Sequence, residues 1–231
     1  MRKLRVDVWS DVACPWCYVG KRRLEVALKR FAHGENVDVV WRAFELDPTA
    51  PSERSPRVPY TQRLSEKYGT SEDQAQAMID RMTDTAKADG LELNFERIRP
   101  GNTFNAHRVL HLAQERGLQD AVKEALFRAY LTEGLPIGDP ATVARVAIQA
   151  GLAAEDVEAV LSSELLTDAV RADEQEASTL GIRGVPFFVI GGKIGLSGAQ
   201  PSDVLLEALE QAWKEGQPAW PQARGEGRTP S

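Results

Sequence analysis

The chain has 231 residues, of which 42% are hydrophobic and 27% charged, with a formal net charge of −6. These proportions are typical of a globular protein, and the length allows one large domain or a core domain with an insertion. Lys and Arg form no dense run, which argues against a nucleic-acid-binding protein. No window approaches the roughly 18 consecutive apolar residues of a membrane span.

The first residues and the cysteine content predict a cytoplasmic protein. Charges interrupt residues 4–9, where a signal peptide would need an apolar stretch of about 7–15 residues. The chain holds two cysteines, Cys14 and Cys17. In a cytosolic protein a single Cys-x-x-Cys indicates redox or metal chemistry rather than a structural disulfide framework.

The N-terminal fifty residues predict a β-α-β unit. Residues 4–9 alternate apolar and charged side chains, as a strand does. Apolar residues then recur at helical spacing from Pro15 to about His33-Gly34. A second, strongly apolar strand is expected at 37–46. Its connection to the first strand through a helix predicts parallel pairing and a right-handed crossover.

The middle of the chain is predicted to be helical, after a Pro- and Ser-rich loop at 47–59. Ser71 to Gln74 has the pattern of a capping box that opens a helix running to Ala88, with Gly90 as its stop. Further helices are expected at about 103–116, 119–132, 140–150, 155–162 and 164–179, separated by glycines.

Strand character returns near the C-terminus. Residues 185–190 form an apolar run, and Gly191-Gly192 predicts a tight hairpin to a strand at 193–196. A last helix should start at Pro201. The order of elements predicts an α/β protein with a thioredoxin fold and a large all-helical domain inserted in its middle. The thioredoxin-like domain would comprise 1–50 and 181–215, the insertion 55–180, and a loosely ordered tail 216–231.

Cys14 and Cys17 are predicted to be a redox pair. Cys14 falls where the first turn becomes a helix, so it is the expected N-cap, and Pro15 suits the first helical position. The free backbone N–H groups of Trp16 and Cys17, with the helix dipole, would favour a thiolate at Cys14. Cys14 would therefore be the nucleophile and Cys17 the more buried resolving thiol.

Metal binding is the less favoured use of these residues. A structural zinc site needs four ligands, and the chain offers one Cys pair and three His. His107, His111 and Glu115 share one face of a predicted helix, but the His-Glu-x-x-His order is missing. We expect that face to be solvated or to lie between domains. Trp9, Trp41 and Trp213 are assigned to the core.

Four separated stretches resemble the DsbA-type branch of the thioredoxin superfamily, in particular the cytoplasmic FrnE-like proteins. They are SDVACPWC (10–17), RAFELDP (42–48), NTFNAHR (102–108), and GVPFF (184–188) together with SGAQP (197–201). The resemblance implies dithiol–disulfide exchange on protein substrates and a helical domain that covers the redox pair. It also implies that Val185-Pro186 is cis and packs against the cysteine motif.

The resemblance extends to the substrate. The backbone before Pro186 would pair with an extended substrate segment. Pro186 would stand with Cys14 and Cys17 in the catalytic site, and substrate contacts would come from Pro15, Trp16, Phe104, His107 and Val185. No tightly bound cofactor is expected, and glutathione or another thiol would supply electrons. Neither nucleic acid nor membrane is an expected partner.

Three departures from these relatives matter. A second pair, Cys-x4-Cys, found in some FrnE-like proteins, is absent. The buried carboxylate of thioredoxin lies six residues before the first cysteine, where this chain has Val8, flanked by Asp7 and Asp11. The sequence does not choose between these two carboxylates. Trp16 replaces the His of oxidising DsbA proteins, so we expect a weaker oxidant, acting as a reductase or isomerase.

Two other functions remain open at this point. Glutathione-dependent isomerases and kappa-class transferases share the inserted helical domain and act on small aromatic substrates, but they usually carry Ser where Cys14 stands. A non-catalytic redox-sensing or chaperone-like protein would use the same scaffold for binding.

Overall fold

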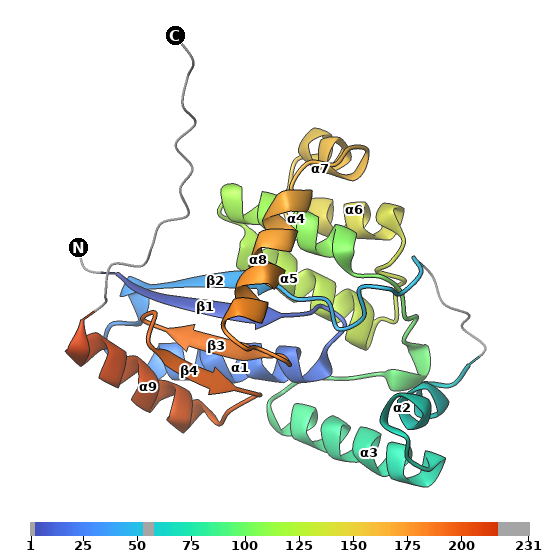
Figure 1. Cartoon of the computed structure of the whole chain (residues 1–231), viewed down its shortest axis with the longest axis horizontal. Coiled ribbons are helices and arrows are strands. Elements are labelled where there is room, and N and C mark those ends of the chain that lie inside the picture. The colour runs from blue at the N-terminus through green and yellow to red at the C-terminus, as the bar shows by residue number, and fades with distance from the viewer. Residues whose placement is uncertain (1–2, 53–57, 217–231) are drawn as a thin grey trace.

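The computed structural model describes residues 3–52 and 58–216 and has a mixed α/β fold (Figure 1). A π-helical turn, Arg128–Thr132, directly follows the helix that ends at Phe127. In chain order the elements are β1 (Leu4–Ser10), α1 (Pro15–Arg30), β2 (Val37–Ala43), α2 (Tyr60–Tyr68), α3 (Glu72–Ala88), α4 (Phe104–Glu115), α5 (Gln119–Phe127), α6 (Pro140–Gln149), α7 (Ala154–Leu161), α8 (Thr167–Thr179), β3 (Phe187–Ile190), β4 (Ile194–Ser197) and α9 (Ser202–Glu215).

A four-stranded sheet joins the two ends of the chain, in the order β2-β1-β3-β4. The pair β1–β2 is parallel, with Ser10 opposite Ala43, which confirms the predicted β-α-β unit. The pairs β1–β3 and β3–β4 are antiparallel, and β3–β4 is the predicted hairpin. The central strand β1 therefore pairs with one strand close in sequence and one near the C-terminus.

Helices cover both faces of the sheet. Alternate residues of β1, among them Val6 and Val8, pack against α1 and α9 on one face. Trp9 points to the other face, where it packs with Ala177 of α8 and donates from its indole N–H to the carbonyl of Asp173 at 2.9 Å. Thus α8 packs against one face of the sheet, although it falls within the range 55–180 that was predicted as the insertion.

The helical block shares its core with the start of α1. One cluster of buried residues runs through α3 to α7 and includes Cys14, Cys17 and Val19. At this contact the ring of Tyr18 stacks on that of Phe127 with centroids 4.9 Å apart. The helices between the two halves of the sheet are therefore packed directly against the cysteine motif.

The observed elements depart from the predicted ones in several places; α8 begins at Thr167 rather than 164, and β3 at Phe187 rather than 185. The strand predicted at 37–46 ends at Ala43, because β1 ends at its partner Ser10 and the Leu46 N–H turns to the carboxylate of Asp11 (2.7 Å). The helix α2 at 60–68 was not predicted as a separate element. The helix predicted at 119–132 changes to a π-helical turn at Arg128. The tail predicted as loosely ordered lies, from residue 217, outside the described residues.

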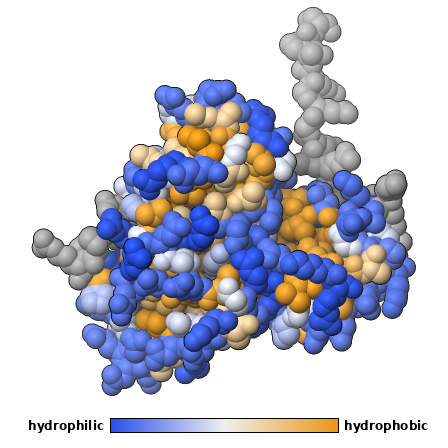
Figure 2. All heavy atoms as spheres, turned by 180° about the vertical axis from the view of Figure 1, so that it is seen from behind, coloured by the Kyte–Doolittle hydropathy of each residue, from blue (hydrophilic) through white to orange (hydrophobic). Residues whose placement is uncertain are grey.

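None of the helices in the part of the chain that the structure describes has the length and apolar character needed to span a bilayer. Seen from behind, hydrophilic residues dominate, and apolar residues appear in separate areas rather than as one continuous face (Figure 2).

Candidate active site

The two cysteines lie at the N-terminal end of α1. Cys14 is the N-cap and Pro15 the first helical residue, as predicted. Both thiols are free; Cys14 is 5% exposed and Cys17 is fully buried. The Cys17 N–H donates to the backbone carbonyl of Cys14 at 3.0 Å, which closes the first turn. Cys14 is thus the more accessible sulfur of the pair.

The Cys14 side chain faces the late Val185-Pro186 segment. Its Sγ donates to the carbonyl of Val185 at 3.6 Å, and the Val185-Pro186 peptide bond is cis, as the resemblance implied. The expectation that helix N–H groups point to the sulfur is not met, because no hydrogen bond caps the helix through the Cys14 side chain. The thiol donates instead to a carbonyl in the segment before β3, 171 residues later in the chain.

Gly20 allows α1 to approach Pro186 closely. A Cβ built on Gly20 would lie 3.0 Å from the Pro186 ring and 3.2 Å from the ring of Phe188. Both distances are shorter than ordinary packing contacts. Sequence reasoning missed Gly20, although an isolated glycine inside a helix is a signal for close packing.

The environment of Cys17 opposes its ionisation. Burial raises the pKa of the Cys17 thiol well above its ordinary value, and the hydrogen bond and charge of Cys14 raise it further, whereas Lys123 lowers it. Lys123 lies on α5, is fully buried, and donates from Nζ to the carbonyl of Ser10 at 3.2 Å. Nothing in the sequence distinguished Lys123 from other helical lysines.

The two candidate carboxylates beside Val8 lie in different places. Asp7 pairs with Arg42 at 2.8 Å on the face of the sheet covered by α8, away from α1. Asp11 lies in the turn before Cys14 and accepts from the Leu46 N–H. Burial raises the pKa of Asp11, but His107 and two backbone N–H groups outweigh it and hold the pKa below its usual value.

The helical side of the site is formed by α4. His107 is 1% exposed, and its Nε2 lies 3.5 Å from Asp11 Oδ1, next to the cysteine motif. Phe104 stacks under the guanidinium of Arg171, 4.3 Å from the ring centroid. Arg171 in turn pairs with Glu45 at 2.8 Å. His107 therefore contacts the turn that holds Cys14, whereas Phe104 packs against the Arg171–Glu45 pair.

The remaining predicted contact residues differ in exposure. Trp16 is 38% exposed beside Cys14, Pro15 is buried, and Val185 is half-buried against the helical core. Trp16 is therefore the most accessible side chain of the motif.

The His107–His111 face lies between the sheet and the helices, one of the two settings expected for it. His111 Nε2 lies 3.0 Å from the carboxylate of Asp173. Within residues 3–52 and 58–216, no cluster of three or more His, Cys, Asp or Glu could hold a metal ion.

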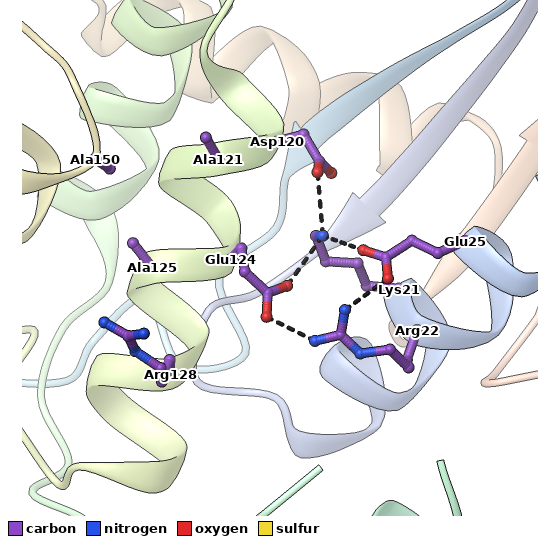
Figure 3. Close-up of a pocket in the computed structure, with 9 residues that line it drawn as sticks. All are labelled: Lys21, Arg22, Glu25, Asp120, Ala121, Glu124, Ala125, Arg128 and Ala150. Atoms are coloured by element: carbon purple, nitrogen blue, oxygen red, sulfur yellow. Dashed lines mark hydrogen bonds and ion pairs between the residues drawn. The ribbon is translucent and has the colours of Figure 1, made fainter. Parts of the chain in front are cut away.

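An open hollow of about 480 Å³ lies between α1 and α5, and neither cysteine lines it (Figure 3). Lys21 reaches from α1 to Glu25, Asp120 and Glu124, and Arg22 bridges Glu25 and Glu124. These charges are paired with one another, so the hollow marks a junction that fixes α5, and with it Lys123, against the active-site helix.

Comparison with known proteins gives consistent matches. The family model described as DSBA-like thioredoxin domain matches residues 5–210. A structure from Streptomyces coelicolor, a probable DsbA oxidoreductase, is 46% identical and has a TM-score of 0.85, covering 93% of this chain and 92% of that chain. The uncharacterized protein YwbO of Bacillus subtilis (strain 168) is 28% identical over 92% of this chain and 98% of its own length. The cytosolic disulfide reductase DsbM from Pseudomonas aeruginosa shares the fold at 20% identity, with a TM-score of 0.57 over 92% of this chain and 100% of that chain.

Proposed function

The chain belongs to the DSBA-like thioredoxin domain family, and from this premise we propose that it is a thiol–disulfide oxidoreductase whose redox pair is Cys14 and Cys17. The observation that carries the proposal is the juxtaposition of a free, slightly exposed Cys14 at a helix N-terminus with the carbonyl of Val185, 3.6 Å away. A fully buried Cys17 lies one turn further along the same helix.

The reaction proceeds by two exchanges. The Cys14 thiolate attacks one sulfur of a substrate disulfide, a mixed disulfide forms, and the other substrate sulfur leaves as a thiolate. The Cys17 thiolate then attacks Cys14 Sγ, which forms the Cys14–Cys17 disulfide and releases the second substrate sulfur with the electron pair of the broken bond. The substrate is reduced and the enzyme oxidised; the reverse sequence oxidises a substrate dithiol.

The proposed substrates are protein disulfides bound as extended segments. Backbone groups before Pro186 would pair with the segment, in the manner of strand addition. Support comes from the exposed Trp16 beside Cys14 and from the position of Val185 at the sulfur. Pro15, Phe104 and His107 complete the proposed contacts.

A small thiol, glutathione in the first instance, would return the enzyme to its dithiol form. The structure of DsbM, which shares this fold, has been solved with GSH. For this chain we propose glutathione as a reductant that binds transiently, not as a tightly bound cofactor. With Trp16 in place of a histidine, we expect a reductase or isomerase of the cytoplasm.

The test is reduction of insulin disulfides with dithiothreitol as the electron source. Wild type should accelerate insulin precipitation, Cys14→Ser should lose the activity, and Cys17→Ser should accumulate a mixed disulfide that mass spectrometry detects. Equal activity of wild type and Cys14→Ser would overturn the proposal. Absence of activity in both, with turnover of a small aromatic substrate by glutathione, would favour the isomerase or transferase alternative.

A further inference from the structure

Cys17 must ionise in the protein interior, and the carboxylates near it are poorly suited to assist. The position of the thioredoxin carboxylate holds Val8, which is packed in the apolar core. Asp7 faces α8 on the opposite side of the sheet. Asp11 accepts from two backbone N–H groups and lies 3.5 Å from His107 Nε2, so its pKa lies below the usual value and it is a weak base.

Lys123 has the setting of a functional lysine. It is fully buried, donates to the carbonyl of Ser10 at the end of β1, and lies against the rings of Phe127 and Trp41, 5.0 and 5.7 Å from their centroids. The nitrogen is hydrogen-bonded to a neutral carbonyl in a largely apolar enclosure. The titratable groups whose charges act on it are Cys17, Asp11 and Cys14, which favour its cation, and Lys21, which disfavours it.

Lys21 provides the contrast. It is also buried, at 2% exposure, and lies four residues after Cys17 on α1. Three carboxylates surround it, so its charge is neutralised locally (Figure 3). Two buried lysines thus lie near the motif, and only Lys123 has a hydrogen-bonding environment that leaves its charge available to a thiolate.

We propose that Lys123 is the group that ionises Cys17 when the mixed disulfide is resolved, an inference that rests on the dithiol function proposed above. As the Cys17 thiol loses its proton, the neutral Lys123 amine gains one and becomes an ammonium, so the proton stays within the buried site. The Cys17 thiolate attacks Cys14 Sγ, the Cys14–Cys17 bond forms, and the bond from Cys14 to the substrate breaks. Its electron pair leaves on the substrate sulfur.

The buried position suits both halves of this role. Burial lowers the pKa of Lys123 to about 8, against the attraction of Cys17, Asp11 and Cys14, so a share of the amine is free to accept a proton near neutral pH. Once protonated, the ammonium stabilises the thiolate more strongly than it would in water, because little solvent screens the two charges.

The experiment measures the ionisation of Cys17 directly. In a Cys14→Ser background Cys17 is the remaining thiol, and its thiolate is followed by ultraviolet absorbance against pH, with the double variant Cys14→Ser/Cys17→Ser as the blank. Lys123→Gln, which keeps a donor for the Ser10 carbonyl, and Lys123→Met should both raise the midpoint by about one pH unit or more. Lys123→Arg should not raise it, because the charge is retained. Lys21→Met is the matched control: three carboxylates already neutralise the Lys21 charge, so the midpoint should move much less than with Lys123→Met.

Two outcomes overturn the inference. One is an unchanged midpoint in a folded Lys123→Gln or Lys123→Met protein, with folding checked by circular dichroism. The other is a rise with Lys123→Arg equal to that with Lys123→Met, which would assign the effect to packing. Because the titration needs no turnover, it separates this inference from the proposed function, which the insulin assay tests with the cysteine pair intact. With that pair intact, Lys123→Gln should slow the decay of a Cys14 mixed disulfide at least about tenfold.

Discussion

Gly20 is the residue that sets the distance between the active-site helix and the segment before β3. A glycine inside a helix normally costs about 1 kcal/mol relative to alanine. Here the missing Cβ leaves room for Pro186 and for the buried ring of Phe188. The absence of a side chain therefore determines how closely Pro186, and Val185 with its carbonyl at Cys14, approach α1.

Replacement of Gly20 by alanine should destabilise the protein in spite of the gain in helix propensity. The added methyl group would lie 3.0 Å from the Pro186 ring, and we expect a net loss of about 1 kcal/mol or more in the free energy of unfolding. Urea denaturation measures it. Gly184→Ala is the control, since a Cβ there meets nothing within 4 Å. Stabilisation by Gly20→Ala would contradict the prediction and show that Pro186 can move to make room for the methyl group.

At the scale of elements, a buried carboxylate on α8, that of Asp173, links this helix to the sheet and to α4. Asp173 accepts from the Arg42 guanidinium at 2.7 Å and from the Ala43 N–H at 2.8 Å, and His111 of α4 lies 3.0 Å away. Burial raises the pKa of Asp173, but His111, Arg42 and the Ala43 N–H outweigh it and hold the pKa below its ordinary value. One side chain thus joins α8, β2 and α4.

The Asp173 contact should stabilise the protein at neutral pH and cease to do so in acid. Because the folded pKa is below the unfolded one, the contribution is present above about pH 4 and is lost as pH falls through the folded pKa. Asp173→Asn should cost about 2 kcal/mol at pH 7 by urea denaturation, and the difference from wild type should shrink at lower pH. Asp168→Asn, an exposed change on the same helix, is the control; a pH-independent difference would contradict the assignment.

Elements whose ends are marked by residues nearby in the sequence could be predicted. Elements whose ends depend on pairing with a distant strand could not. The helix from Glu72 to Ala88 carries its capping box in Ser71 and Gln74, and both hydrogen bonds are present. The end of β2 was misplaced because the length of β1 decides it. The same division holds in the site: the motif revealed Cys14 and Cys17, whereas Lys123 and Gly20 act through neighbours distant in sequence.

At the scale of the whole molecule, the helical block and the sheet behave as one packed body. Gln119 at the start of α5 receives the Trp41 N–H at 2.9 Å and donates to the Trp41 carbonyl at 2.8 Å, so a side chain completes the hydrogen bonding of β2. The stacked Tyr18 and Phe127 rings add a second contact. Separation of the two parts would expose the cysteine motif and uncover the edge of the sheet.

The two parts should therefore unfold together. None of the five tryptophans lies within residues 55–180, so their fluorescence arises outside the helical block, while far-ultraviolet circular dichroism is dominated by the helices. We expect the two probes to give coincident transitions in urea, as for a two-state domain. Two separated midpoints would show that the helical block melts independently.

The placement of β1 between β2 and β3 also bears on how the protein is made. Synthesis delivers β1, α1 and β2 first, and the chain must grow by more than a hundred further residues before β3 arrives to occupy the other side of β1. Until then the nascent chain presents an unpaired strand edge, which is open to wrong partners. Cys14 and Cys17 are likewise synthesised long before Val185 and Pro186, which pack against the cysteine-bearing helix in the folded protein. A chain interrupted before residue 185 would carry both thiols without the Val185 carbonyl that Cys14 contacts and without β3.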